Sequence, residues 1–198
     1  MASNSSLVIF FHGIGASGAQ LMPLASGWRP VLTHSRFAAP DAPFHHRYGH
    51  QWFRVDNNPL AADNIQAARE GFDRTVADIV EKEGFRGSQD RIAFVGVSQG
   101  AIVALDAVAS GRWKVGALVS FAGLLAPMPI SSAGRNTPVL LVHGQDDRTI
   151  PSIASTMAAT QLRGAGFQVE LQLLPRVGHT ISPGGAELAL QFLQKSLA

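Results

Sequence analysis

A serine at position 98 stands between two glycines in the stretch 96–100, Gly-Val-Ser-Gln-Gly. This G-x-S-x-G pattern is typical of a nucleophile elbow, a tight turn from a strand into a helix that lifts the serine hydroxyl above a sheet. The flanking glycines let neighbouring chain segments approach a backbone that is itself strained. The same residues also fit a glycine-rich turn whose serine only caps the helix. The chemistry that an elbow predicts is attack of the serine oxygen on a carbonyl carbon.

Two further groups that such chemistry needs occur later in the chain. Asp146 and Asp147 follow the apolar run 139–142, and His179 follows the run 169–174. A histidine can accept the proton of the serine hydroxyl, and an acid can hold that histidine in the right tautomer. Each group alone has an ordinary explanation as a cap, turn or loop residue. Their order along the chain, with one group in each successive loop, favours a triad of Ser98, His179 and one of the two aspartates.

A glycine-rich turn, His-Gly-Ile-Gly at 12–15, follows the first apolar run of the chain. Attack on a carbonyl places negative charge on its oxygen, and backbone N–H groups already in position stabilise that charge. We expect the donors to be the N–H groups of Ile14 and of Gln99, the residue after the serine. Taken alone, the turn at 12–15 is more typical of an ordinary glycine turn after a strand.

Other candidate residues lie between positions 45 and 53. His45, His46 and His50 gather in one polar stretch, but no acidic or cysteine partner has a recognisable metal-ligand spacing. No metal and no cofactor is therefore predicted, and the role of this stretch stays open. Of the neighbouring aromatic pair, Phe53 is expected in the core. For Trp52 two interpretations stay open: it belongs to the core, or it forms the wall of an acyl pocket and is a candidate for contacting substrate.

The elements that would position these residues follow from the hydrophobic pattern. Continuous apolar runs predict strands buried on both faces, and an apolar stripe spaced three or four residues apart predicts a helix. Strand and helix alternate, which predicts an α/β fold with a mainly parallel sheet of about six strands and helices on both faces. In such sheets the loops after the strands carry the chemistry. The strands are expected at 7–11, 36–39, 91–96, 115–121, 139–143 and 169–174, and the helices at 60–83, 101–109, 153–163 and 186–197.

Length and composition restrict the classes of protein. The chain has 198 residues, which suits a single domain over 1–198. The formal net charge is +2 and the arginines are scattered, so no nucleic-acid partner is expected. Cysteine is absent, which fits a reducing compartment and excludes a cysteine nucleophile. The run 7–11 is too short for a signal-peptide core or a membrane span, so we expect a cytoplasmic protein that acts on a small molecule. The oligomeric state is not predicted.

Together these motifs resemble the carboxylesterase/phospholipase family of α/β hydrolases, which includes acyl-protein thioesterases and small bacterial esterases. The resemblance implies an α/β-hydrolase fold with Ser98 as nucleophile and His179 as base. Through the D-x-x-[VI]-P spacing it implies Asp147, not Asp146, as the acid. It also implies Ile14 and Gln99 as the oxyanion-hole donors. The matching stretches are 11–15, 51–53, 96–101, 143–144 with 147–151, and 178–179, and the resemblance they carry extends over nearly the whole chain.

Three features depart from the family pattern. Ala16 and Arg54 stand where the family often has acidic residues, and the chain begins almost directly at a strand expected near the centre of the sheet. The departures bear on substrate preference and on the size of the sheet, and they leave the triad intact.

The resemblance implies a serine carboxylesterase that hydrolyses short- to medium-chain esters, with thioesters also possible substrates, through an acyl-enzyme intermediate. No lid domain is expected, because the stretch 122–136 is short. Three alternatives stay open: a non-catalytic binding protein on the same fold, an acyltransferase, and a lipase-like depolymerase that uses the same triad.

Overall fold

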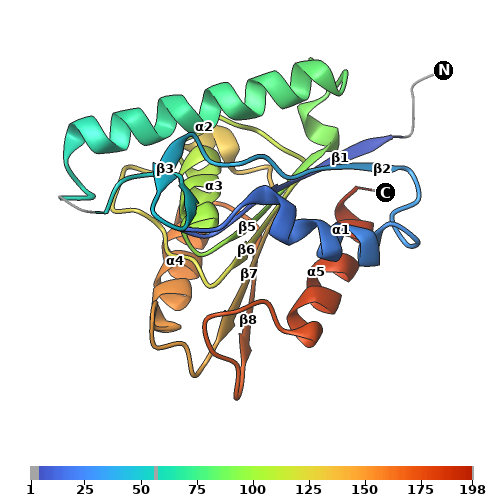
Figure 1. The fold of residues 1–198 in the computed structure, drawn as a ribbon. Helices are drawn as coiled ribbons and strands as arrows, with labels where there is room; N and C mark the ends of the chain where they lie inside the picture. The colour runs from blue at the N-terminus through green and yellow to red at the C-terminus, as the bar shows by residue number, and fades with distance from the viewer. Residues whose placement is uncertain (1–4, 56–57, 198) are drawn as a thin grey trace.

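The computed structural model describes residues 5–55 and 58–197, so the ends of the predicted domain, Met1 and Ala198, lie outside the described residues. Within this part of the chain, six parallel strands form one sheet in the order β2-β1-β5-β6-β7-β8 (Figure 1). The strands are β1 (Ser6–Phe11), β2 (Ser35–Ala38), β5 (Ile92–Val97), β6 (Ala117–Phe121), β7 (Val139–Gly144) and β8 (Val169–Leu174).

Helices cover both faces of this sheet. The helices α2, α3 and α4 pack on one face, and α1 and α5 pack on the other (Figure 1). They are α1 (Met22–Trp28), α2 (Ala62–Lys82), α3 (Gln99–Ala109), α4 (Ile153–Gly164) and α5 (Pro183–Ser196).

The first strand shows why its sequence is continuously apolar. Side chains alternate across a strand, so Leu7, Ile9 and Phe11 enter the core beneath α2 and α3. The intervening Val8 and Phe10 enter the core beneath α1 and α5. All five side chains are fully buried, as expected for a strand of a parallel sheet with helices on both faces.

The predicted α/β-hydrolase architecture is confirmed, and three local features differ from the expectation. The sequence analysis missed α1, whose stretch contains Pro23 and Gly27, both poor helix formers, although a proline suits the first turn. It also missed a short antiparallel hairpin of β3 (Phe44–His46) and β4 (Gly49–Gln51), because this stretch is polar and does not alternate. Finally, α5 begins at Pro183 rather than at 186, since two glycines obscured its start.

No lid domain occurs between β6 and β7 in the part of the chain that the structure describes. The described residues between β6 and β7 contain one short 3-10 helix, Ser132–Gly134, and no longer element. Among residues 5–55 and 58–197, no helix is long and apolar enough to cross a lipid bilayer.

Candidate active site

The serine of the elbow lies at the junction of β5 and α3 in a strained conformation. Ser98 has φ 54° and ψ −120°, a combination that residues other than glycine rarely adopt. Its N–H donates to the carbonyl of Phe121 (2.9 Å), which fixes the turn against β6. A side chain at Gly100 would overlap the backbone of Phe11 and His12, so the turn requires glycine at this position.

A chain of two hydrogen bonds connects the serine to an acid. His179 Nε2 lies 2.8 Å from Ser98 Oγ, and His179 Nδ1 lies 2.7 Å from Asp147 Oδ2. Because the carboxylate only accepts, Nδ1 carries the proton and Nε2 of the neutral ring accepts from the serine hydroxyl. Ser98 follows β5, Asp147 follows β7 and His179 follows β8, so the three side chains meet at the carboxyl ends of the strands. The adjacent Asp146 is exposed to solvent.

The buried carboxylate of Asp147 is held in its ionised form. Burial opposes the charge, but the hydrogen bond from His179 and those from the backbone N–H groups of Ile150 and Thr149 outweigh it, so the pKa of Asp147 lies below its usual value. The two backbone donors lie 2.9 and 2.8 Å from Oδ1. An ionised acid at this point can stabilise a histidine cation.

The two predicted oxyanion donors lie on either side of the serine. The N–H of Gln99 is the first in α3 and so has no acceptor within the helix. Within the described residues no hydrogen bond uses the N–H of Ile14, whose side chain is 39% exposed. The turn that carries Ile14 lies against the serine, since a Cβ added at Gly13 would lie 3.4 Å from the Cβ of Ser98. A carbonyl oxygen placed here can therefore meet two free donors.

A buried histidine that the sequence analysis did not single out supports this turn. His12 Nδ1 donates to the carbonyl of Gly13 (2.7 Å), and its Nε2 accepts the N–H of Ala42 (3.0 Å). Burial lowers the pKa of His12, which favours the neutral ring that this pattern needs. The one sequence feature that could have indicated this role is the position of His12 at the start of the His-Gly-Ile-Gly turn.

The hairpin of β3 and β4, which contains His45, His46 and His50, also holds the turn at 12–15 in place. The N–H of Gly15 donates to the carbonyl of His50 (2.8 Å), and the N–H of His50 donates to the carbonyl of Ala16 (2.9 Å). His45 and His50 are cross-strand partners within the hairpin. Among the residues that the structure describes, no three histidine or acidic side chains are grouped so that they could hold a metal ion.

The burial of Trp52 corrects the expectation that it contacts substrate. Its side chain is 0% exposed, packs against Phe11 and Phe72, and donates from Nε1 to the carbonyl of His12 (2.9 Å). A ring with no exposed surface fills the core and cannot touch a ligand. Its neighbour Phe53 is partly buried and packs against the core, as expected, and it also lines a cavity.

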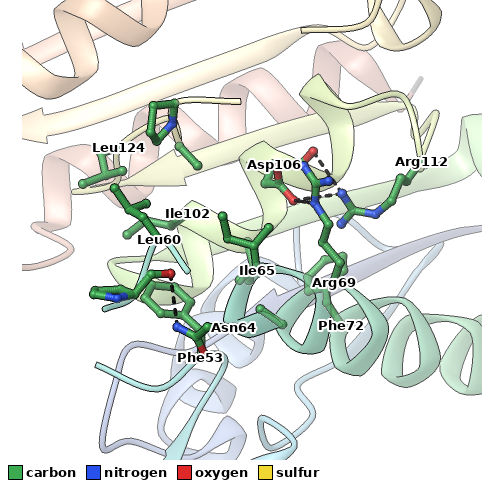
Figure 2. A pocket seen from close by; sticks show the side chains of 15 residues that line it. Phe53, Leu60, Asn64, Ile65, Arg69, Phe72, Ile102, Asp106, Arg112 and Leu124 are labelled. Carbon is green, nitrogen blue, oxygen red and sulfur yellow. Dashed lines mark hydrogen bonds and ion pairs between the residues drawn. The ribbon is translucent and has the colours of Figure 1, made fainter. Parts of the chain in front are cut away.

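That cavity has a volume of about 260 Å³ and lies between α2 and α3 (Figure 2). None of the three hydrogen-bonded side chains lines it, but Ile102 at one end is a single helical turn beyond Ser98. The walls are apolar and include Phe53, Leu60, Ile65, Ala68, Phe72, Ile102, Val103, Leu124, Ala126 and Pro127.

Charged side chains close the opposite end of the cavity (Figure 2). Arg69 donates to both oxygens of Asp106, at 2.9 and 2.7 Å, and Arg112 donates to the same carboxylate at 2.8 Å. Burial opposes ionisation of Asp106, but the hydrogen bond from Arg69 and the charge of Arg112 outweigh it and lower the pKa of Asp106. Arg112 also donates to Asp73 (2.9 Å), so two carboxylates balance the two arginines at this end of the cavity and it does not attract a free anion.

The chain is similar to known proteins along almost its whole length. The sequence profile of a family described as Phospholipase/Carboxylesterase matches residues 2–197. The chain is similar to esterase YpfH of Escherichia coli K12, with 26% identity over 96% of this chain and 83% of the relative. It is also similar to acyl-protein thioesterase 1 of Gibberella zeae, with 26% identity over 99% of this chain and 92% of the relative. Among solved structures, esterase PE8 superposes with a TM-score of 0.83 at 29% identity, covering 97% of this chain and 93% of that one.

Proposed function

The chain belongs to the phospholipase/carboxylesterase family and is a hydrolase, and on that premise we propose that it is a serine carboxylesterase. In this proposal Ser98 is the nucleophile, His179 the general base and Asp147 the acid that orients the base. The observation that carries it is the unbroken path of hydrogen bonds from Asp147 Oδ2 through His179 to Ser98 Oγ, at 2.7 and 2.8 Å. No such path is needed by a protein that only binds a ligand.

The reaction proceeds in two steps through one covalent intermediate. His179 Nε2 takes the proton from Ser98 Oγ as the oxygen attacks the ester carbonyl, and the N–H groups of Ile14 and Gln99 stabilise the negative oxygen. The tetrahedral species collapses, the bond to the alcohol breaks, and the alcohol leaves with the proton from His179, which leaves the acyl group on Ser98. Water then gives a proton to His179 and attacks the acyl-enzyme. As this second tetrahedral species collapses, the bond to Ser98 Oγ breaks, His179 returns the proton to that oxygen, and the carboxylic acid is released. A thioester follows the same path with a thiol as leaving group.

The apolar cavity supports short- to medium-chain acyl groups as substrates. Its near end is formed by Phe53, Ile102 and Leu124, and the carbonyl of Phe53 accepts a hydrogen bond from the side chain of Gln99 (2.8 Å). An acyl chain attached to Ser98 can therefore extend along α3 into an apolar space. The ion pair of Arg69 and Asp106 closes the far end and limits the length of that chain. A cytoplasmic location, expected from the sequence, stays a prediction.

The test of the proposal combines a substitution with a covalent probe. Ser98→Ala should lower ester turnover by about three to six orders of magnitude, because the nucleophile is removed. A fluorophosphonate should label Ser98 in the wild-type protein and nothing in the variant. The matched control is Ser120→Ala, which removes a buried hydroxyl that has no hydrogen-bond partner in the described part of the chain and should leave turnover unchanged. Labelling of another serine, or turnover that survives in Ser98→Ala, would overturn the assignment.

A further inference from the structure

A second buried histidine contacts the same acid as His179. His143 is the second-to-last residue of β7, four residues before Asp147, and its side chain is 0% exposed. Its Nε2 lies 3.1 Å from Asp147 Oδ2 and 2.8 Å from the carbonyl oxygen of Ile150. Its Nδ1 lies 2.6 Å from the hydroxyl of Ser155, in the first turn of α4. The reaction as described above uses neither His143 nor Ser155.

The partners of His143 determine where its ring proton lies. A carbonyl oxygen and an ionised carboxylate only accept hydrogen bonds, so Nε2 must carry the proton that it shares between Ile150 and Asp147. In the neutral ring Nδ1 is then an acceptor, and the Ser155 hydroxyl donates to it. Ser155 is fully buried and has no other side-chain hydrogen bond within the described residues. It therefore selects the tautomer that lets His143 donate to the acid.

This donor completes the hydrogen bonding of the carboxylate. Asp147 Oδ1 accepts from the N–H groups of Thr149 and Ile150, and Oδ2 accepts from His179 and His143. A carboxylate offers about four lone-pair sites, so all of them are occupied and the group cannot rotate. Two donors on Oδ2 also divide the negative charge of that oxygen, so that His179 receives only part of it.

We propose that His143 is a positioning residue that holds Asp147 Oδ2 opposite His179 and, by sharing that oxygen, sets the pH range in which His179 accepts protons. Ser155 keeps His143 in the donating tautomer. The inference rests on the proposed function, because it takes His179 as the base. Within the described residues, Asp147 is the one ionisable side chain that contacts His143, and His179 contacts Asp147 and Ser98.

The experiment compares three variants by kcat, KM and their dependence on pH. His143→Phe removes the donor and should lower kcat by about ten- to a hundredfold with little change in KM, the range for losing a hydrogen bond to a charged group. The acid limb of its pH profile should move to higher pH, because the full charge of Oδ2 then favours the protonated form of His179. His143→Gln places an amide N–H where Nε2 lies and should restore both kcat and the acid limb. Ser155→Ala should shift both in the same direction as His143→Phe, but less.

The outcomes separate this inference from its premise. An unchanged pH profile and kcat in folded His143→Phe, even with a lower melting temperature, would show that His143 only fills the core. If His143→Gln is as impaired as His143→Phe, the donor role is wrong. Should His143→Phe not fold, normal kinetics and an unchanged acid limb in Ser155→Ala would equally overturn it. Failure of a fluorophosphonate to label Ser98 in the wild type would instead refute the proposed function.

Discussion

The length of the acyl chain should control the rate, and Ile102→Phe should remove that control. Ile102 lies on α3 at the end of the cavity near Ser98, so a larger ring there closes the path from the serine into the apolar space. Because this side chain borders a void, the ring fills space, and we expect a smaller loss of stability than the usual 1–3 kcal/mol for overpacking a core.

The magnitude follows from the cavity. Each buried methylene contributes about 0.8 kcal/mol, or roughly fourfold in kcat/KM, so the six methylenes by which octanoate exceeds acetate give at most about 3,000-fold. Ser98 and Asp106 are about 12 Å apart along the helix at 1.5 Å per residue, which is roughly ten bonds of an extended chain at about 1.2 Å per bond. Roughly three of those bonds run from the Ser98 backbone to the acyl carbonyl carbon, so acyl groups of about eight carbons reach the ion pair. Longer chains must disturb the bond from Arg69 to Asp106, so the increase should stop there.

The assay measures kcat/KM for p-nitrophenyl esters from acetate to decanoate, each below its solubility limit. The ratio of octanoate to acetate is the quantity compared, because a general loss of activity cancels in it. We expect Ile102→Phe to lower this ratio at least tenfold. Ile153→Phe is the control, since Ile153 is 59% exposed and does not line the cavity. A wild-type rate that does not change with chain length, or an unchanged ratio in Ile102→Phe, would refute the reasoning.

Further predictions concern the acid, the base and the elbow. Asp147→Asn should lose roughly four orders of magnitude in kcat, because an amide favours the wrong histidine tautomer. Asp146→Asn, at an exposed position, should have a kcat close to that of the wild type. The reverse result in folded proteins would refute the choice of acid. The profile of kcat/KM should fall on acidification, since protonated His179 cannot accept a proton, and a flat profile in intact protein would exclude a histidine base. Because the pKa of Asp147 is lowered in the fold, the ionised carboxylate stabilises the protein at neutral pH, and this contribution is lost as the pH falls below about 4. The melting temperature of Asp147→Asn should therefore fall less on acidification than that of the wild type. Gly100→Ala should lower the melting temperature strongly, because the added Cβ would overlap backbone atoms. Gly27→Ala is the control: it lies in a helix with nothing within 4 Å of the added Cβ, so it should leave the melting temperature unchanged or raise it. Equal effects of the two substitutions would contradict the packing argument.

The sequence alone determined the architecture and the residues that stand at the strand ends. Buried strands and amphipathic helices have local periodicities, so the alternation that defines the sheet is visible without any long-range information. The elbow is only partly local: a Cβ at Gly96 would meet the backbone of Gly100 and Ala101 in the same turn, whereas a Cβ at Gly100 would meet the backbone at the end of β1. The choice of Asp147 over Asp146 came from its spacing to the following Ile-Pro pair, which the family resemblance supplied.

Only the tertiary structure decided which side chains reach the site and which are buried. Trp52 and Phe53 are adjacent and both aromatic, yet one fills the core and the other lines the cavity, because neighbouring residues face different surroundings. His143 meets Ser155 across the loop from β7 to α4, and His12 meets Ala42 thirty residues away. Such contacts depend on how separate elements pack, and no periodicity within either segment encodes them. The cavity between α2 and α3 has the same origin, since it exists only once the two helices lie side by side.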